Sequence, residues 1–264
     1  MADTNKIKKI NIDGVDYHLM DEETYKKTLY TNATPTPSAL GGIAKGTTFN
    51  EKPISEVLNS LLYPYVSFSA SMSTSPSGSV YEIGTSVNVT SATINITLGS
   101  ASITSIVVKD SANTTLGSKT SGITSGGNII SISKSISSNE TLKAIVTDST
   151  GASKTISSSS FTFVNPYYYG AISSDATLSE SLIKGLTKNV TTRGNKTYTI
   201  TMNQQKGVIA YPSSYGALTK ILDENSFNVT DTFIQNTLTI NGVSYYVYVL
   251  NNPVTSTMKY TFSY

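Results

Sequence analysis

The sequence predicts a mainly β protein in which a short hairpin and one helix precede two β-rich domains. Serine and threonine together make up roughly 30% of the chain, a composition that suits strands and turns. Hydrophobic residues fall to 38%, yet 17 tyrosines remain to build a core. From about residue 66 onward, apolar and polar residues alternate with the period of a half-buried strand. We therefore expect four segments: residues 1–30, 31–65, 66–164 and 165–264.

Charge and residue usage exclude several classes of function. The chain has 19 basic and 17 acidic residues, and Arg193 is its single arginine. It thus lacks the basic footprint of a nucleic-acid-binding protein. There is no cysteine, and His18 is the single histidine, which excludes disulfides, thiolate nucleophiles, Cys/His zinc sites and His-based triads. No run of 18 apolar residues predicts a membrane span, and the first residues do not resemble a secretory signal.

Residues 1–30 are expected to form an anchor. Asp13-Gly14 is a strong signal for a two-residue hairpin turn. This turn would pair Ile12 with Val15 and Ile10 with Tyr17, and a short helical turn is expected at 21–27. One face of the hairpin then carries the candidate docking residues Ile10, Ile12, Val15, Tyr17 and Leu19. Because an isolated hairpin is marginally stable in water, this apolar face needs a partner surface.

Residues 31–65 combine a linker with a helix. The stretch 31–52 is rich in Pro and Thr and then in Gly, which is typical of linkers. A helix is expected from Pro53, a good first helical residue, to the stop at Pro64. Its apolar residues fall on one stripe, at Ile54, Val57, Leu58, Leu61 and Leu62. This stripe must pack on the chain itself or on other copies of it.

Residues 66–164 predict several short antiparallel strands. Val87, Val89, Ile94 and Ile96 alternate with polar residues, and clusters of Gly, Asn, Asp and Ser separate the strands. Such spacing over roughly 100 residues is typical of an immunoglobulin-like β-sandwich, here without the Cys–Trp–Cys core of antibody domains.

A change of composition at 165–176 places a domain boundary near Asn165. Beyond it, Asn241-Gly242 predicts a second hairpin, which would pair Ile240 with Val243 and Leu238 with Tyr245. The face of that hairpin with Tyr245 would point inward. Tyr246 and Tyr248 would point outward, which makes them candidates for a host or partner surface.

We select no catalytic, cofactor-binding or metal-binding residue, and we expect no enzyme. His18 falls on the polar face of the first hairpin. The acidic residues are scattered over strands and turns, with no pair that suggests a glycosidase. Asp110, Asp148 and Asp231 lie in or near turns, where Asp more often caps the turn than binds calcium.

Several segments carry a resemblance to a known group of proteins. They are Gly-Gly-Ile-Ala-Lys-Gly-Thr-Thr-Phe at 41–49, Pro-Ile-Ser-Glu-Val-Leu at 53–58 and Leu-Leu-Tyr-Pro-Tyr at 61–65. Further segments are Ala-Tyr-Pro-Ser-Ser-Tyr-Gly-Ala-Leu at 210–218, residues 240–248, and Ile-Asn-Ile-Asp-Gly-Val-Asp-Tyr at 10–17. Together they resemble tailed-bacteriophage virion structural proteins, in which the 41–65 type of stretch precedes an immunoglobulin-like domain.

The resemblance implies a non-enzymatic head fibre, tail fibre or baseplate appendage on the particle exterior. Its partners would be other virion proteins, such as capsid, portal, tail or baseplate, with a host surface glycan as a further candidate. Fibres of this type are commonly homotrimers. Two alternatives stay open: a glycan-binding adhesin whose C-terminal domain binds sugar, and a cell-wall glycosidase.

Overall fold

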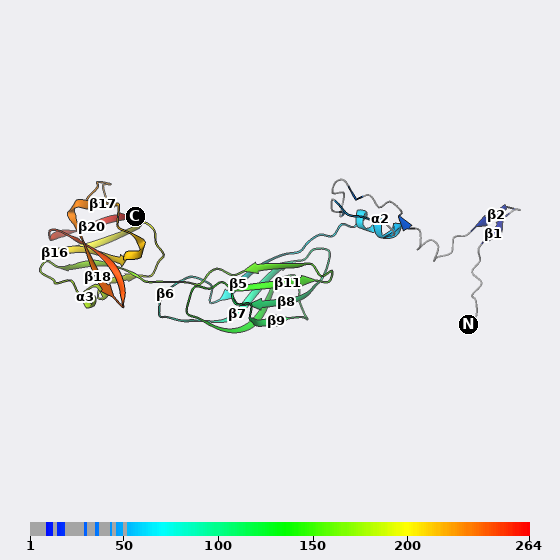
Figure 1. The fold of residues 1–264 in the computed structure, drawn as a ribbon, viewed down its shortest axis with the longest axis horizontal. Helices are drawn as coiled ribbons and strands as arrows, with labels where there is room; N and C mark the ends of the chain where they lie inside the picture. Colours follow the sequence, from blue (N-terminus) through cyan, green and yellow to red (C-terminus); the bar gives the residue numbers. More distant parts are fainter. Residues whose placement is uncertain are drawn as a thin grey trace.

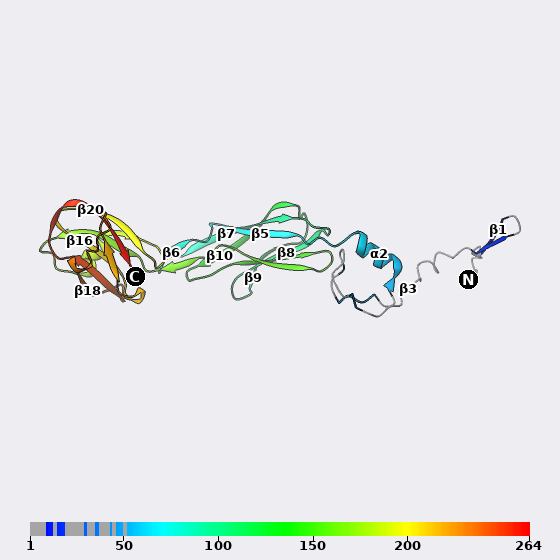
Figure 2. The same cartoon turned by 90° about the horizontal axis from the view of Figure 1, so that it is seen from above.

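The computed structural model of the chain describes residues 9–12, 15–18, 29–30, 35–36, 43, 46–49 and 52–264. The helical turn expected at 21–27 and most of the linker expected at 31–52 lie outside these residues. Figures 1 and 2 show helix α2, a central β unit and a C-terminal β unit following one another along the long axis. Here the central unit comprises the strands from Ser69 to Val164, and the C-terminal unit those from Tyr167 to Ser263. The fold is mainly β, which confirms the predicted class at this level.

The first hairpin has the register expected from its turn. Strands β1 (Lys9–Ile12) and β2 (Val15–His18) are antiparallel, with Ile10 opposite Tyr17 and Ile12 opposite Val15. Strand β3 (Leu29–Tyr30) pairs with β4 (Lys52–Pro53), directly before the helix.

Helix α2 spans Ile54–Leu62, so the predicted helix is confirmed with a small change at its start. Pro53 is the residue before the helix and not the first residue in it, because its ψ of 137° is extended and it pairs with Leu29. The helix ends two residues before Pro64, as the restricted backbone ahead of a proline favours.

The central unit contains two antiparallel sheets and one parallel strand pair. The three-stranded sheet has the order β10 (Gly126–Ile136), β7 (Val87–Thr97), β5 (Ser69–Ser75). The four-stranded sheet has the order β12 (Ser153–Ser157), β11 (Lys143–Asp148), β8 (Ile103–Lys109), β9 (Thr115–Lys119). Strand β6 (Val80–Glu82) pairs in parallel with β13 (Thr162–Val164).

One core lies between these two sheets. Ile94 of β7 and Ile106 of β8 are fully buried in it, together with Val146 of β11 and Phe161. In β7 and β11 the buried residues alternate with more exposed ones, because only one face of each sheet meets the core. The structure therefore confirms the inward-facing side chains that the alternation in the sequence predicts.

The C-terminal unit is a seven-stranded antiparallel sheet with three short helical segments. Its strands are β14 (Tyr167–Ser173), β15 (Thr187–Asn189), β16 (Lys196–Pro212), β17 (Lys220–Leu222), β18 (Phe233–Ile240), β19 (Val243–Leu250) and β20 (Val254–Ser263). Helix α3 (Glu180–Lys184) and the short helices η1 (Ser213–Tyr215) and η2 (Thr230–Thr232) join them. The order β15-β14-β16-β19-β18 is extended by β20, which pairs with β16 and β17.

Strand β16 gives the sheet its curvature. Its first part pairs with β20, and its last part pairs with β14 and β19. Between the two parts the register shifts at Gln204, whose φ of 51° is left-handed. Such a bulge bends the strand, so the sheet curls and encloses one core on its concave side.

Both faces of the curved sheet are covered. Tyr211 and Tyr248 belong to the enclosed core, whereas Val208 and Val247 belong to a second core that Ile183 of α3 completes. Consecutive residues of β16 and β19 are therefore buried, and the alternation that marks a one-sided sheet is lost. The Asn241-Gly242 hairpin is confirmed in register, with φ values of 49° and 77° at its two turn residues.

Candidate functional site

A series of exposed apolar side chains begins on helix α2. Ile54, Leu58 and Leu62 are 42%, 49% and 68% exposed, and no residue of the helix is buried. The surface continues into Tyr63 and Val66, which are also exposed. We call these five residues the neck surface. Exposed apolar side chains that gather in one patch are typical of interaction sites, so the neck surface is a candidate for one.

Hydrogen bonds attach the segment after helix α2 to the central unit. The Tyr65 hydroxyl donates to Asp148 Oδ2 over 2.5 Å. The Val66 N–H donates to Ser100 Oγ, and the Ser100 N–H donates to the Val66 carbonyl, both over 2.8 Å. These bonds attach the segment that follows the helix to the central unit.

The Tyr65–Asp148 hydrogen bond shifts the pKa values of both groups. Hydrogen bonds from Tyr65 and from Thr150 hold the pKa of the Asp148 carboxyl below its usual range. The same bond to Asp148 raises the pKa of the Tyr65 phenol. Near neutral pH, Tyr65 is thus a donor and Asp148 a charged acceptor, which is the stronger form of this hydrogen bond.

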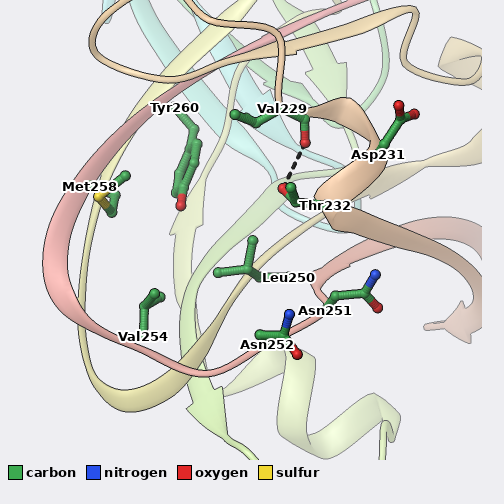
Figure 3. Close-up of a pocket in the computed structure, with 9 residues that line it drawn as sticks. All are labelled: Val229, Asp231, Thr232, Leu250, Asn251, Asn252, Val254, Met258 and Tyr260. Atoms are coloured by element: carbon green, nitrogen blue, oxygen red, sulfur yellow. Dashed lines mark hydrogen bonds between the residues drawn. The ribbon is translucent and has the colours of Figure 1, made fainter.

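A pocket of about 370 Å³ lies in the C-terminal unit, where η2, the end of β19 and strand β20 meet (Figure 3). Its apolar part is lined by Val229, Leu250, Val254, Met258 and Tyr260. Its polar part is lined by Asp231, Thr232, Asn251 and Asn252, all of which are exposed. In Figure 3 the side chains of Asp231 and Asn251 extend away from the apolar residues of the pocket.

Local hydrogen bonds hold the frame of this pocket. The Asn251 N–H donates to the Thr232 carbonyl over 2.8 Å, which ties the β19–β20 turn to η2. The Thr232 hydroxyl donates to the Val229 carbonyl over 2.7 Å, the dashed line in Figure 3. The Tyr260 ring is 3% exposed and packs edge-on against Phe233, with 5.3 Å between ring centroids. The backbone frame of the pocket and the position of the Tyr260 ring are therefore fixed by contacts within the C-terminal unit.

Two of the turn aspartates have structural partners. Asp110 accepts from the Thr114 N–H and pairs with Lys134 over 3.0 Å, and this Lys134 hydrogen bond holds the Asp110 pKa below its usual range. Asp148 accepts from the N–H groups of Thr150 and Ala152. Both therefore cap turns, as predicted. Within residues 52–264 and the shorter described segments, no three His, Cys, Asp or Glu side chains come together in an arrangement that could hold a metal ion.

The candidate docking residues of the hairpin fall on its paired strands. Ile10, Ile12, Val15 and Tyr17 occupy β1 and β2 in directly opposed pairs, and Leu19 lies outside the described residues. The docking role of this hairpin face stays a prediction.

The expectation that Tyr248 faces outward is wrong. Tyr248 is 4% exposed, and its hydroxyl accepts from the Leu218 N–H over 2.9 Å and donates to Gln235 over 2.7 Å. Tyr246 is partly buried against Tyr211, with the rings edge to face. The reason is the curl of the sheet, which turns this face of β19 into the enclosed core. These two tyrosines therefore do not form an open tyrosine surface.

Sequence reasoning did not find the pocket. In the sequence Asp231 has the pattern of a turn residue, and no motif singles out Asn251 or Asn252. The adjacent Asn-Asn-Pro turn at 251–253 marks a loop but no ligand. The signal appears only when η2 and β20 come together in space.

Comparisons with known proteins add no family assignment: no protein-family model matches the chain, and a search of curated proteins gives no match. Among the described residues, neither helix combines the length and apolar character needed to cross a lipid bilayer.

Proposed function

We propose that this chain is a non-enzymatic structural appendage of a tailed-bacteriophage virion, a fibre-like component that projects two β units from the capsid or tail. The observation that carries the proposal is the serial order of the exposed helix and the two β units along one axis (Figures 1 and 2). An exposed apolar segment at one end and self-contained cores beyond it are what an attached, projecting component requires. The sequence resemblance of residues 10–17, 41–65, 210–218 and 240–248 supplies the virion class.

The central unit would be an immunoglobulin-like sandwich. Two antiparallel sheets of three and four strands enclose one core, as in that architecture. The parallel pairing of β6 with β13 brings an early strand of the unit beside its last one. Such a unit serves as a rigid spacer that carries the C-terminal unit away from the attachment point.

The neck surface would join copies of the chain, with three copies as the favoured number. Glu56 is the only charged residue within α2, and Lys52 pairs with it over 3.1 Å. The helix therefore carries no unpaired charge that would repel a neighbouring copy. Association would remove Ile54, Leu58 and Leu62 from water, which is favourable in proportion to the apolar area buried.

The hairpin ahead of the neck would attach the assembly to the particle. The register of β1 and β2 places Ile10 and Tyr17 opposite each other, and Ile12 opposite Val15, on one face with Leu19 next in the pattern. In this scheme the hairpin docks on capsid or tail proteins, and the β units face the medium and the host envelope.

The proposal is tested on purified particles of the phage that encodes the chain. Mass spectrometry should detect the protein at a fixed ratio to the major capsid protein. Immunogold labelling against the C-terminal unit should decorate the particle exterior. Absence of the chain from particles that remain infectious would overturn the proposal.

A further inference from the structure

We infer that the outer edge of strand β18 accepts an extended segment of a partner protein, which joins the seven-stranded sheet as an additional strand. The segment carries aliphatic and small polar side chains at alternate positions. This inference goes beyond membership of a virion, because it assigns a binding mode to the C-terminal unit. The choice of a partner protein over a second copy of the chain rests on the proposed neck trimer.

The backbone of β18 has unused hydrogen-bonding groups on its outer side. The two-residue turn at 241–242 makes Ile240 and Val243 a hydrogen-bonded pair, so every second residue back along β18 points its N–H and C=O groups at β19. The residues between them point these groups away from β19. They include Gln235, Thr237 and Thr239. Among the described residues, neither a strand nor a side chain bonds to these outward groups, so each of the three residues offers one donor and one acceptor.

Other long sheet edges in the described part of the chain are covered at least in part. In the central unit β5 lies beside β12, and β9 lies beside β10. A Cβ added at Gly117 of β9 would come within 2.8 Å of the Ser131 carbonyl of β10. In the C-terminal unit β17 pairs with the end of β20, and the Glu224 carboxylate accepts from the Lys259 N–H of that strand over 3.1 Å. The open edge of β18 is therefore a distinctive feature of the sheet.

Strand β18 lacks the features that usually protect an edge. Natural edge strands are often very short or bulged, or they carry Lys or Pro. Strand β18 has eight residues, and its pairing with β19 has no register shift. Its sequence, Phe-Ile-Gln-Asn-Thr-Leu-Thr-Ile, contains no charged residue and no proline. Such an edge is a template for another strand, and main-chain hydrogen bonds would supply the affinity.

The side chains of β18 define which segment fits beside it. Ile234 lies on the face of the second core, is 52% exposed, and lines a pocket of about 130 Å³ together with Leu178 and Val249. On the other face Gln235, Thr237 and Thr239 are exposed. Because directly opposed residues of an antiparallel pair share a face, the added strand should place aliphatic side chains beside Ile234 and small polar ones beside Thr237.

A partner protein fits this edge better than a second copy of the chain. Two identical edges pair antiparallel about a two-fold axis, which joins copies two at a time. Three copies held together at the neck would therefore leave at least one β18 edge unpaired. A segment of another protein can occupy all three edges in the same way.

Amide hydrogen exchange on the purified full chain, read at single residues, tests whether the edge is open. The outward amides of Gln235, Thr237 and Thr239 should exchange faster than the two amides between them, which bond to β19. Equal protection of the two sets would show that the edge is already covered, and the inference would be wrong.

The binding probe is the synthetic strand acetyl-Lys-Thr-Val-Thr-Val-Thr-Val-Thr-Lys-amide. At millimolar concentration it should slow exchange of the outward amides of β18. Two further peptides carry N-methyl groups on every threonine amide or on every valine amide. Only one alternate set of amides can face β18 in an added strand, so one methylated peptide should bind and the other should not. No protection by the unmethylated peptide, or equal behaviour of the two methylated ones, would overturn the inference.

Variants of β18 locate the binding. Thr237→Pro removes an outward N–H that the sheet does not use, and proline is accepted at such edge positions, so the variant should fold. It should weaken peptide binding at least about tenfold. Thr237→Val is the matched control, because it keeps the N–H and the β-branched shape, and it should bind like the wild type.

A second variant keeps the test valid if Thr237→Pro does not fold. Ile234→Thr leaves the backbone and the β-branched shape unchanged but removes apolar surface beside the added strand, so it should weaken peptide binding about threefold or more. Wild-type affinity in Ile234→Thr and in folded Thr237→Pro would place the peptide elsewhere and overturn the assignment to β18.

Light scattering distinguishes a partner protein from a second copy. The Leu58→Asp variant, which lacks the neck contact, should be monomeric and should still bind the peptide. If it instead remains associated, and Thr237→Pro abolishes that association, β18 joins copies of the chain and the partner assignment is wrong. A monomeric wild type would contradict the neck trimer, whereas strand addition at β18 is decided by peptide binding.

Discussion

The Tyr65 hydroxyl donates a 2.5 Å hydrogen bond to the carboxylate of Asp148, a residue 83 positions later in the chain. Asp148 is 2% exposed and lies at the end of strand β11, in a turn that it also caps. This contact joins the segment after helix α2 to the four-stranded sheet. The chain between Tyr63 and Val66 of the neck surface is therefore attached to a residue of the central unit.

Tyr65→Phe should loosen this connection and lower the stability of the central unit. The substitution removes one donor from a carboxylate that is shielded from water, while Thr150 and Ala152 still donate to it. The expected result is a lower urea midpoint in equilibrium unfolding. The control is Tyr63→Phe, which alters a 77% exposed tyrosine two residues away. Equal midpoints for the two variants would show that the bond adds no stability.

Acid should destabilise the central unit through Asp148 and Asp110. The folded-state pKa of each carboxyl is lowered. The largest cause is the hydrogen bond from Tyr65 for Asp148 and the hydrogen bond from Lys134 for Asp110. The unfolded chain thus binds protons more readily than the native one. The resulting stabilisation is fully present above the unfolded-state pKa of about 3.9, and it is lost as the pH falls through the lower folded-state values. The free energy of unfolding, measured from pH 7 to 2, should be nearly flat above about pH 5 and then fall. Asp148→Asn should flatten that fall, and an unchanged slope would contradict the assignment.

Tyr248→Phe should destabilise the C-terminal unit. The Tyr248 hydroxyl is the acceptor for the buried Leu218 N–H, and phenylalanine would leave that donor without a partner. Loss of a buried partner costs about 1–3 kcal/mol. Tyr246→Phe is the matched control on the same strand, because its hydroxyl has no hydrogen bond with a described residue, and it should change the free energy of unfolding by less than about 0.5 kcal/mol. Chemical denaturation of the two variants measures the difference.

Leu58→Asp should disrupt self-association through the neck surface. Wild-type protein is expected to show about three times the chain mass of 28.1 kDa in light scattering at micromolar concentration. A charge on the 49% exposed Leu58 would have to be buried between copies, so the variant should be monomeric. Asn59→Asp adds the same charge beside it on the helix, outside the apolar stripe, and should leave the mass unchanged. A monomeric wild type would indicate that the neck surface does not join copies.

Changes to the first hairpin should prevent incorporation into particles. Ile10 and Tyr17 are directly opposed in β1 and β2, so replacing both with Asp puts two charges on the expected docking face. Copy number in purified particles should fall to near background, as it should after deletion of residues 1–30. The His18→Ala variant changes a residue that the alternation of the sequence puts on the opposite face, and it should assemble normally. Normal copy number in the double-Asp variant would show that the docking face is wrongly assigned, and normal copy number after the deletion would move attachment to the 53–65 segment.

Local features of this protein follow from the sequence by itself. The turn residues Asp13-Gly14 and Asn241-Gly242 set the register of both hairpins, because a two-residue turn leaves neighbouring strands one way to pair. The helical spacing of residues 54–62 and the alternation in β7 likewise depend on contacts within one element. Each of these signals is short in range; the strand pairings and the alternation appear at the expected residues, and the helix begins one residue later than expected.

Features that join distant segments depend on the tertiary structure. The bulge at Gln204 curls the sheet and buries Tyr248, and no alternation within β19 reveals that its second face is covered. The pocket likewise brings Asp231, Asn251 and Tyr260 together from η2, a turn and β20. The Tyr65–Asp148 hydrogen bond joins two residues that are 83 positions apart in the sequence. The physical reason is common to all three: a residue pattern reports which side of its own element is apolar, whereas burial and binding depend on which other element comes to lie against it.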